Sequence, residues 1–140
     1  MWQNKLSGNI PSEIGMLQKL QYMILSKNNF IGNIPSSFGN LTALVRFYLD
    51  ENNLQGNIPP SLSKCRNLFI LNLAKNLSGS ISPQVNGLSF SPIFLNLSSN
   101  QFIGVTPVEV GNFKNLEGLD ISKNMLFGKI PASLGSCIML

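Results

Sequence analysis

The side chains best suited to chemistry in this sequence are aromatic and charged residues that recur at an interval of 24 positions. Tyr22 and Arg46 are separated by this interval, Ile24 and Tyr48 are separated by it too, and Asp50 follows two positions later. Tyrosine and arginine are enriched among the residues that dominate binding energy at protein interfaces. The chemistry that this spacing favours is molecular recognition, provided that the fold places successive 24-residue segments side by side.

A repeated unit supplies the elements that would position these side chains. In its clearest copy, residues 116–139, leucine or a near equivalent occupies the first, fourth, sixth, eleventh, nineteenth and twenty-second places. The ninth place is Asn124, the thirteenth is Gly128, and the pair Ile130-Pro131 follows. A period between about 20 and about 29 residues with leucines spaced L-x-x-L-x-L-x-x-N-x-L predicts a leucine-rich-repeat solenoid.

The unit recurs along the whole chain. Its first places fall at Leu20, Leu44, Leu68, Pro92 and Leu116, and residues 1–19 fit the frame as the tail of an earlier unit. We therefore predict one array over residues 1–140, without a cap at either end. It consists of a partial repeat at 1–19 and repeats at 20–43, 44–67, 68–91, 92–115 and 116–139.

The repeat at 68–91 departs from the pattern. One residue is missing between Asn76 and Leu77, Ser82 replaces the proline of the Ile-Pro pair, and an extra residue before Leu95 restores the period. Such an irregularity can be a loop with a function or drift in a tolerant surface turn, and we favour drift.

Alternation within each unit predicts a short strand. In the repeat from Leu20, Met23 and Leu25 would face the core, because successive side chains of a strand point to opposite faces. Tyr22 and Ile24 would then face outward. Asn28, at the ninth place, stands where the chain must turn. Its amide can bond to backbone groups of neighbouring turns, so repeated asparagines would form a ladder.

The sequence contains few of the residue types that usually act in catalysis or bind metal ions. The 140 residues contain no histidine, which is a frequent general base and the commonest metal ligand. The two cysteines, Cys65 and Cys137, stand three repeats apart, which places them about 14 Å from each other at ~4.8 Å per stacked strand. A disulfide needs Cα atoms within about 7 Å. We expect two reduced, buried cysteines, and no disulfide, metal, cofactor or enzymatic activity.

Charge and hydropathy argue against nucleic acid and membrane partners. The net charge is +4, but the ten basic residues are scattered along the chain without a run of three, unlike a nucleic-acid-binding patch. The stretch 1–25 lacks the unbroken apolar core of a signal peptide. Residues 76–108 are uncharged but interrupted by polar side chains, so we expect no membrane span. We also expect no membrane contact by residues 1–140 themselves.

The repeats read LxxLxLxxNxLxGxIPxxLGxLxx, with GNIP at Gly32 and Gly56 and GKIP at Gly128. They resemble the plant extracellular class of leucine-rich repeats, and above all the ectodomains of leucine-rich-repeat receptor-like kinases of the pathogen-sensing kind. The resemblance implies an α/β solenoid in a right-handed twisted array. Short parallel β-strands would line its concave face, with a second short strand near the Gly-x-Ile-Pro segment, and 3-10 turns and loops would form its convex face.

The same resemblance implies a glycoprotein at the extracellular face of the plasma membrane, acting in defence signalling. Its partners would be a protein or peptide ligand and a co-receptor kinase. A kinase activity would belong to a domain that these residues do not contain, since a catalytic loop of the HRD type requires histidine.

Outward positions of the concave strands would form columns one strand spacing apart, and these columns define the candidate ligand site. An alternative is that this cluster forms only one flank of a site centred on other repeats. The predicted ligand-binding residues are Tyr22, Ile24, Arg46, Tyr48, Asp50, Ile70 and Asn72.

Three N-glycosylation sequons begin at Asn40, Asn76 and Asn96. Asn40 would lie on a convex turn and Asn96 would point from the concave sheet, so both are candidate glycosylation sites. Asn76 occupies the ladder position, where a glycan would remove buried hydrogen bonds, and we predict that it is unmodified.

Three functional hypotheses remain open at the level of sequence. The first is a recognition module, part of a receptor-like kinase ectodomain that binds an extracellular ligand or co-receptor. The second is a secreted enzyme inhibitor similar to polygalacturonase-inhibiting proteins, which use a very similar repeat. The third is a truncated product without an activity of its own.

Overall fold

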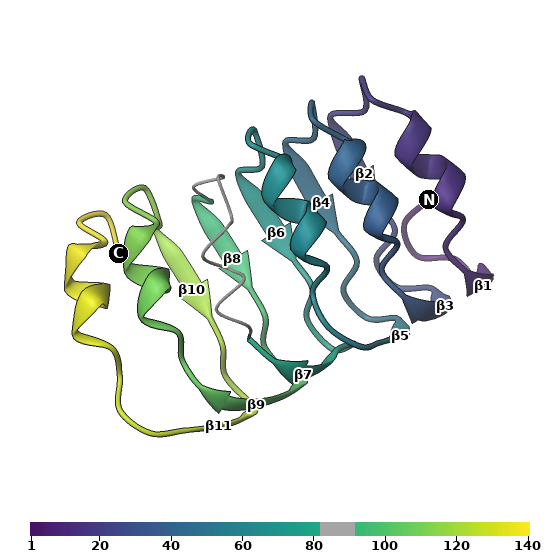
Figure 1. Cartoon of the computed structure of the whole chain (residues 1–140). Coiled ribbons are helices and arrows are strands. Elements are labelled where there is room, and N and C mark those ends of the chain that lie inside the picture. The colour runs from purple at the N-terminus through teal and green to yellow at the C-terminus, as the bar shows by residue number, and fades with distance from the viewer. Residues whose placement is uncertain (82–91) are drawn as a thin grey trace.

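Every 24-residue unit contributes one strand to a single parallel sheet, which we call the concave sheet (Figure 1). The structure is a computed structural model that describes residues 1–81 and 92–140. Register joins equivalent places of successive units, so that Tyr22 lies opposite Arg46 and Arg46 lies opposite Ile70. In the order in which they pair, the strands are β10 (Gly118–Asp120), β8 (Phe94–Asn96), β6 (Ile70–Asn72), β4 (Arg46–Tyr48) and β2 (Tyr22–Ile24).

Two smaller parallel sheets run along the side of the array, near the Gly-x-Ile-Pro segments. One contains β1 (Ser7–Asn9), β3 (Asn29–Asn33) and β5 (Asn53–Gln55), and the other contains β7 (Ser78–Ser80), β9 (Gln101–Val105) and β11 (Met125–Phe127).

The interruption between the two side sheets falls at the irregular repeat. Ser78 lies opposite Gln101, whereas Ile103 lies opposite Met125, so the offset in sequence number is larger by one in the first pair. This difference is the expected effect of the residue missing after Asn76. Ser82 and the other residues of 82–91 lie outside the described residues.

Short 3-10 helices cover the face opposite the concave sheet (Figure 1). Each follows the proline of an Ile-Pro or equivalent pair; Pro35, for example, has φ −61° and ψ 134°, and its ring holds the backbone extended immediately before the turn. The helices are η1 (Ser12–Met16), η2 (Ser36–Asn40), η3 (Pro60–Lys64), η5 (Val108–Asn112) and η6 (Ala132–Ser136).

One continuous apolar core runs between the strands and the 3-10 helices. Met23 and Leu25 are buried and Tyr22 and Ile24 are exposed, as the alternation predicts. Phe38 and Phe47, both fully buried, meet edge to face with ring centroids 5.7 Å apart, a favoured geometry for aromatic pairs. The fold is the predicted leucine-rich-repeat solenoid of parallel strands and 3-10 turns.

The cysteines belong to this core, as predicted. Cys65 and Cys137 are free and buried, and their thiols donate hydrogen bonds to the carbonyl oxygens of Phe38 and Val110, at 3.3 and 3.5 Å. Burial raises the pKa of the Cys65 thiol to about 11. This thiol therefore stays protonated at neutral pH.

The predicted asparagine ladder is present. Asn52 Nδ2 donates to the carbonyl oxygens of Leu49 and Leu25, at 2.9 and 3.1 Å, and Asn52 Oδ1 accepts the backbone N–H of Phe30 at 3.2 Å. The amide thus links its own turn to two backbone groups of the preceding repeat, the carbonyl of Leu25 and the N–H of Phe30. Equivalent bonds are made by Asn28, Asn76, Asn100 and Asn124.

Candidate functional site

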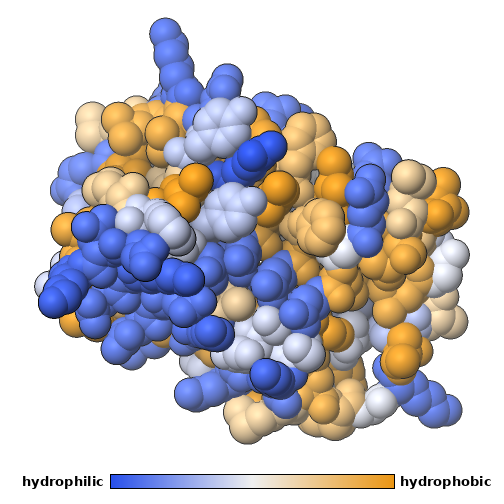
Figure 2. All heavy atoms as spheres, turned by 180° about the vertical axis from the view of Figure 1, so that it is seen from behind, coloured by the Kyte–Doolittle hydropathy of each residue, from blue (hydrophilic) through white to orange (hydrophobic). Residues whose placement is uncertain are grey.

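Six of the seven predicted ligand-binding residues line one shallow depression of about 510 Å³ on the concave sheet. Figure 2 views the molecule from the side opposite that of Figure 1 and shows hydrophobic and hydrophilic side chains next to one another on that surface. Ile70 does not line the depression, although it lies opposite Arg46 in the sheet. The residues that line it are Trp2, Tyr22, Ile24, Ser26, Arg46, Tyr48, Asp50 and Asn72.

Arg46 is held over the sheet by an aromatic ring. Its guanidinium carbon lies 5.6 Å from the centroid of the Tyr22 ring, within the range of a cation–π contact. Of the described residues, only Lys75 and Glu51 form an ion pair, so the Arg46 guanidinium makes no ion pair with a described carboxylate. Five N–H donors on an exposed, oriented cation are suited to a carboxylate of a ligand.

Asp50 is oriented by a neighbouring repeat. Ser26 Oγ donates a 2.6 Å hydrogen bond to Asp50 Oδ1, and Ser26 is itself buried. The bond fixes the carboxylate at the end of the strand that carries Tyr48. The Glu51–Lys75 pair beside it, at 3.3 Å, is solvent-exposed and contributes at most ~1 kcal/mol.

Two residues of the depression, Trp2 and Ser26, were absent from the sequence-based prediction. Trp2 is 53 % exposed, and Lys27 Nζ lies 5.8 Å from its ring centroid. Trp2 and Ser26 each stand two positions before a residue at the ladder position, Asn4 and Asn28, as Asp50 stands before Asn52. The signal that could have found them is this column, continued backward into the partial repeat at 1–19.

A second column, at the fifth place of the repeats, contains asparagine side chains that hydrogen-bond to the backbone two residues further on. The backbone N–H groups of Ala74 and Ser98 donate to the Oδ1 atoms of Asn72 and Asn96, at 3.2 and 3.0 Å. These bonds leave the two Nδ2 groups without a described acceptor, as donors for a ligand.

Asp120 completes this column on β10, where Ser122 N–H donates to its Oδ1 at 3.0 Å. The side-chain and backbone hydrogen bonds from Ser122 lower the pKa of the Asp120 carboxyl. Asp120 therefore stays ionised to a lower pH than an ordinary aspartate does, and its carboxylate can accept a bond from a ligand.

The sequons lie in different environments. Asn40 is exposed at the end of η2, and Asn96 is partly buried with its Oδ1 engaged by Ser98. Asn76 Nδ2 donates to the carbonyl oxygens of Leu49 and Ala74, at 2.9 and 2.8 Å. Modification of Asn40 and Asn96, and its absence at Asn76, stay predictions.

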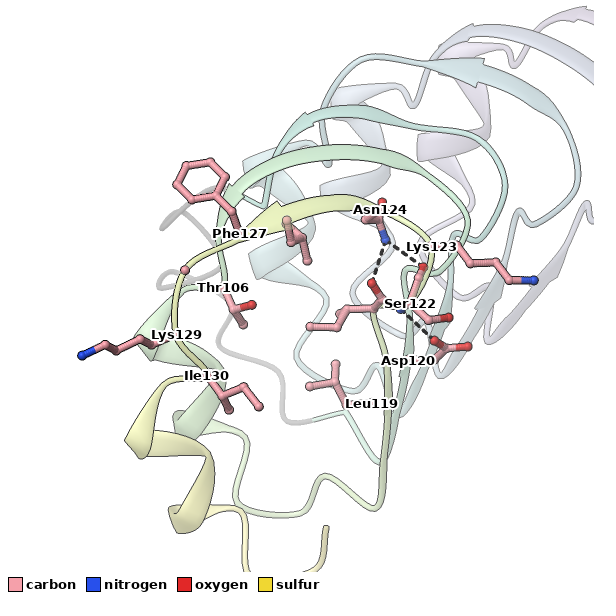
Figure 3. A pocket seen from close by; sticks show the side chains of 12 residues that line it. Thr106, Leu119, Asp120, Ser122, Lys123, Asn124, Phe127, Lys129 and Ile130 are labelled. Atoms are coloured by element: carbon pink, nitrogen blue, oxygen red, sulfur yellow. Dashed lines mark hydrogen bonds between the residues drawn. The ribbon is translucent and has the colours of Figure 1, made fainter.

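A second hollow, of about 490 Å³, lies within the repeat from Leu116 (Figure 3). Leu119, Ile121 and Leu126 line it together with polar residues of the turn. The equivalent positions of an earlier repeat, among them Phe47 and Leu49, are fully buried beneath the next unit. The hollow therefore corresponds to the face that an earlier repeat buries against its neighbour, and we do not assign it to a ligand.

The rest of the described chain offers no group of three His, Cys, Asp or Glu side chains able to hold a metal ion. Within residues 1–81 and 92–140, every helix is too short or too polar to span a bilayer.

Solved structures of plant receptors share the fold over nearly the whole chain. The plant peptide hormone receptor RGFR1, solved with RGF2, superposes with a TM-score of 0.92 at 35 % identity, covering 99 % of this chain and 22 % of the receptor. The Arabidopsis receptor kinase HAESA, solved with the peptide hormone IDA and the co-receptor SERK1, gives 0.88 at 38 % identity, covering 95 % and 22 %. The chain thus spans about a fifth of these ectodomains.

A plant ice-binding protein also superposes, with a TM-score of 0.81 at 32 % identity, covering 90 % of this chain and 48 % of that protein. The fold therefore serves more than one function, and the side chains of the concave sheet must decide between them.

Sequence comparison identifies the family directly. No curated protein matches the chain significantly, but the family model described as Leucine Rich Repeat matches residues 19–41, 43–65, 91–113 and 115–137. Because these segments cover more than half of the sequence, repeat by repeat, the chain belongs to the leucine-rich-repeat family.

Proposed function

We propose that this chain is a recognition module that binds an extracellular protein or peptide ligand through the concave sheet. The observation that carries the proposal is the depression in which Tyr22, Arg46, Tyr48 and Asp50 converge from adjacent strands. Aromatic and arginine side chains gathered on an exposed surface have the composition of a binding hot spot.

The shape of the site favours a polymer over a small molecule. Small-molecule sites are usually concave pockets that bury most of the ligand, whereas this depression is shallow and merges with the row formed by Asn72, Asn96 and Asp120. Side chains presented at one strand spacing over several strands can contact successive residues of an extended chain.

The structural relatives support the same class of ligand. RGFR1 and HAESA were solved with peptides, and HAESA also with a co-receptor. By analogy, the chain would form part of the ligand-binding surface of a receptor ectodomain at the outer face of the plasma membrane, with a co-receptor as a further partner. Recognition, and no catalysis, is the activity that we assign to it.

Selection of peptides against the full 140-residue chain tests the proposal. Peptides from a random library should bind the purified protein, and Arg46→Glu and Tyr48→Ala should each weaken binding about tenfold, the effect of losing one hot-spot side chain. Matched controls are Arg66→Glu and Phe127→Ala, which change exposed residues away from the concave sheet. Equal losses in the control variants, or none at Tyr48 and Arg46, would overturn the proposal.

A further inference from the structure

Three of the outward rows of the concave sheet carry charges of opposite sign at separate positions along the array. These rows are the second, third and fifth places of the repeats. Their only charged residues are Arg46, on the second strand from one end of the sheet, and Glu117 and Asp120 at the other end. The two strands between them, β6 and β8, present apolar side chains and amides. In full, the rows read Gln21, Val45, Phe69, Ile93, Glu117; Tyr22, Arg46, Ile70, Phe94, Gly118; and Ile24, Tyr48, Asn72, Asn96, Asp120.

The acidic end also has an exposed aromatic ring. Phe94 is 51 % exposed, and its ring lies across the backbone of Gly118: a Cβ built on Gly118 would lie 2.7 Å from Phe94 Cδ1 and 3.0 Å from Cζ. Gly118, which lies between Glu117 and Asp120 in the sequence, thus leaves space for the ring because it has no Cβ. A cation in this part of the sheet would be attracted by the ring quadrupole and by the carboxylates that the same strand region carries at Glu117 and Asp120.

The basic position is the guanidinium of Arg46, which lies over the Tyr22 ring and makes no ion pair with a described carboxylate. Asp50 lies in the next row, at the seventh place, where Ser26 holds its carboxylate. β4, which carries Arg46, and β10, which carries Asp120, are three strand steps apart in the sheet order, or about 14 Å at ~4.8 Å per step. An extended peptide spans this distance in about five residues at ~3.3 Å per residue.

We propose that the concave sheet selects an extended peptide segment whose charged side chains have opposite sign, with a carboxylate at Arg46, an apolar side chain on Ile70 and Phe94, and a cation at Glu117 and Asp120. This inference rests on the proposed peptide-binding function and adds the charge pattern of the ligand. A chain can lie in either direction on this surface, so the positions of the two charges matter and not which one comes first.

Blocked pentapeptides test the charge pattern, because blocked termini leave only side-chain charges. One probe carries lysine at its first, leucine at its third and glutamate at its fifth position, with small neutral residues between them. Three further probes carry lysine, glutamate or glutamine at both ends. Fluorescence polarisation with the 140-residue chain should show the lysine–glutamate probe binding about fivefold or more tightly than the other three.

Charge reversal in the protein should change the preference in a defined way. Arg46→Glu should make the probe with two lysines the tightest ligand, and the double variant Glu117→Lys/Asp120→Lys should favour the probe with two glutamates. Outside the three rows, Arg66→Glu makes the same charge change as Arg46→Glu, and Glu109→Lys makes the change of one of the two acidic reversals. Both controls should leave the original order intact. All the reversed residues are exposed or partly exposed, and circular dichroism would verify that each variant is folded.

The charge proposal is overturned if the lysine–glutamate probe fails to bind at about 1 mM, or if the order of the probes is the same in the concave variants as in the controls. Its failure can be told apart from failure of peptide binding. If the glutamine probe binds as well as the others and Tyr48→Ala abolishes that binding, peptide recognition stands and the charge pattern is wrong. If no selected peptide or probe responds to Tyr48→Ala, both proposals fail.

Discussion

The side-chain oxygen of Asn33 occupies the space beside the Cα of Gly56 in the next repeat: a Cβ built on Gly56 would lie 2.8 Å from Asn33 Oδ1. Gly56 also has a φ of +74°, in the left-handed region that disfavours L side chains. Both constraints recur at Gly32, which has a φ of +77° and where an added Cβ would lie 2.5 Å from Asn9 Oδ1. These two constraints explain why the GNIP pattern has glycine at its first position.

Gly56→Ala should therefore lower the free energy of unfolding by about 1–3 kcal/mol, through backbone strain and the displaced asparagine. Urea denaturation followed by circular dichroism measures the change. Gly135→Ala is the matched control, because a Cβ there meets nothing within 4 Å and its φ is not positive. If the two alanine variants were equally stable, the proposed role of the GNIP glycine would be wrong.

The asparagine ladder yields a second stability prediction. Asn52→Ala removes donors to two buried carbonyl groups and leaves the N–H of Phe30 without its acceptor, so it should cost about 2–4 kcal/mol. Asn4, whose amide makes one exposed bond to the Trp2 carbonyl, is the control, and Asn4→Ala should cost less than ~0.5 kcal/mol. Thermal and urea unfolding of both variants would show whether the ladder holds the repeats together.

The residue before each ladder asparagine adopts a left-handed conformation, which predicts that asparagine will stabilise the fold there. Lys123 has a φ of +53°, and asparagine adopts this region more readily than lysine. Lys123→Asn should raise the free energy of unfolding by about 0.5–1 kcal/mol. Lys129→Asn, at an exposed lysine with ordinary φ, should be neutral; a lower stability of Lys123→Asn than of this control would contradict the prediction.

Ionisation of Cys65 should make the protein less stable at alkaline pH. Burial raises the pKa of this thiol from 9.0 to about 11, so between these values the unfolded chain loses a proton that the folded chain retains. The stabilisation is complete below pH 9 and should fall by about 2–3 kcal/mol as the pH rises from about 9 to 11.

Cys65→Ser removes the thiol and keeps a donor for the Phe38 carbonyl. Its stability should start lower than that of the wild type, but the difference between the two proteins should shrink over this pH range. Urea unfolding at several pH values measures the slope. A constant difference from pH 8 to 11 would show that Cys65 does not carry the effect.

Much of the fold can be predicted from the sequence because the same pattern of apolar and asparagine positions recurs in each repeat. Leu25, Leu49, Leu73 and Leu97 occupy one place in successive units and all are buried, so an error at one repeat is corrected by the others. The ladder asparagines and the two buried cysteines could be placed for the same reason. Periodicity assigns a residue to a face, and that is sufficient for the core.

The candidate site follows from periodicity only in part. The columns brought Tyr22, Arg46 and Asp50 to one surface, but Trp2 entered the depression from a partial repeat whose outward residues had not been assigned. The ring of Phe94 over Gly118 depends on a rotamer and on the absence of a neighbouring Cβ. Neither is visible in a pattern of hydrophobic and polar letters, because both arise from contacts between different repeats.

That contact provides a test of the cationic end of the ligand site. Gly118→Ala forces the Phe94 ring to move, and because the ring is half exposed, the free energy of unfolding should change by less than ~1 kcal/mol. The lysine–glutamate pentapeptide should bind about two- to fivefold more weakly, the effect of losing one cation–π contact. The probe with glutamine at both ends should weaken less than this, because it loses only the contact of its leucine with the ring, and Gly135→Ala should change neither affinity. If the lysine–glutamate peptide bound Gly118→Ala as tightly as the wild type, the ring of Phe94 would have no part in recognising the cation, and Glu117 and Asp120 alone would have to account for it.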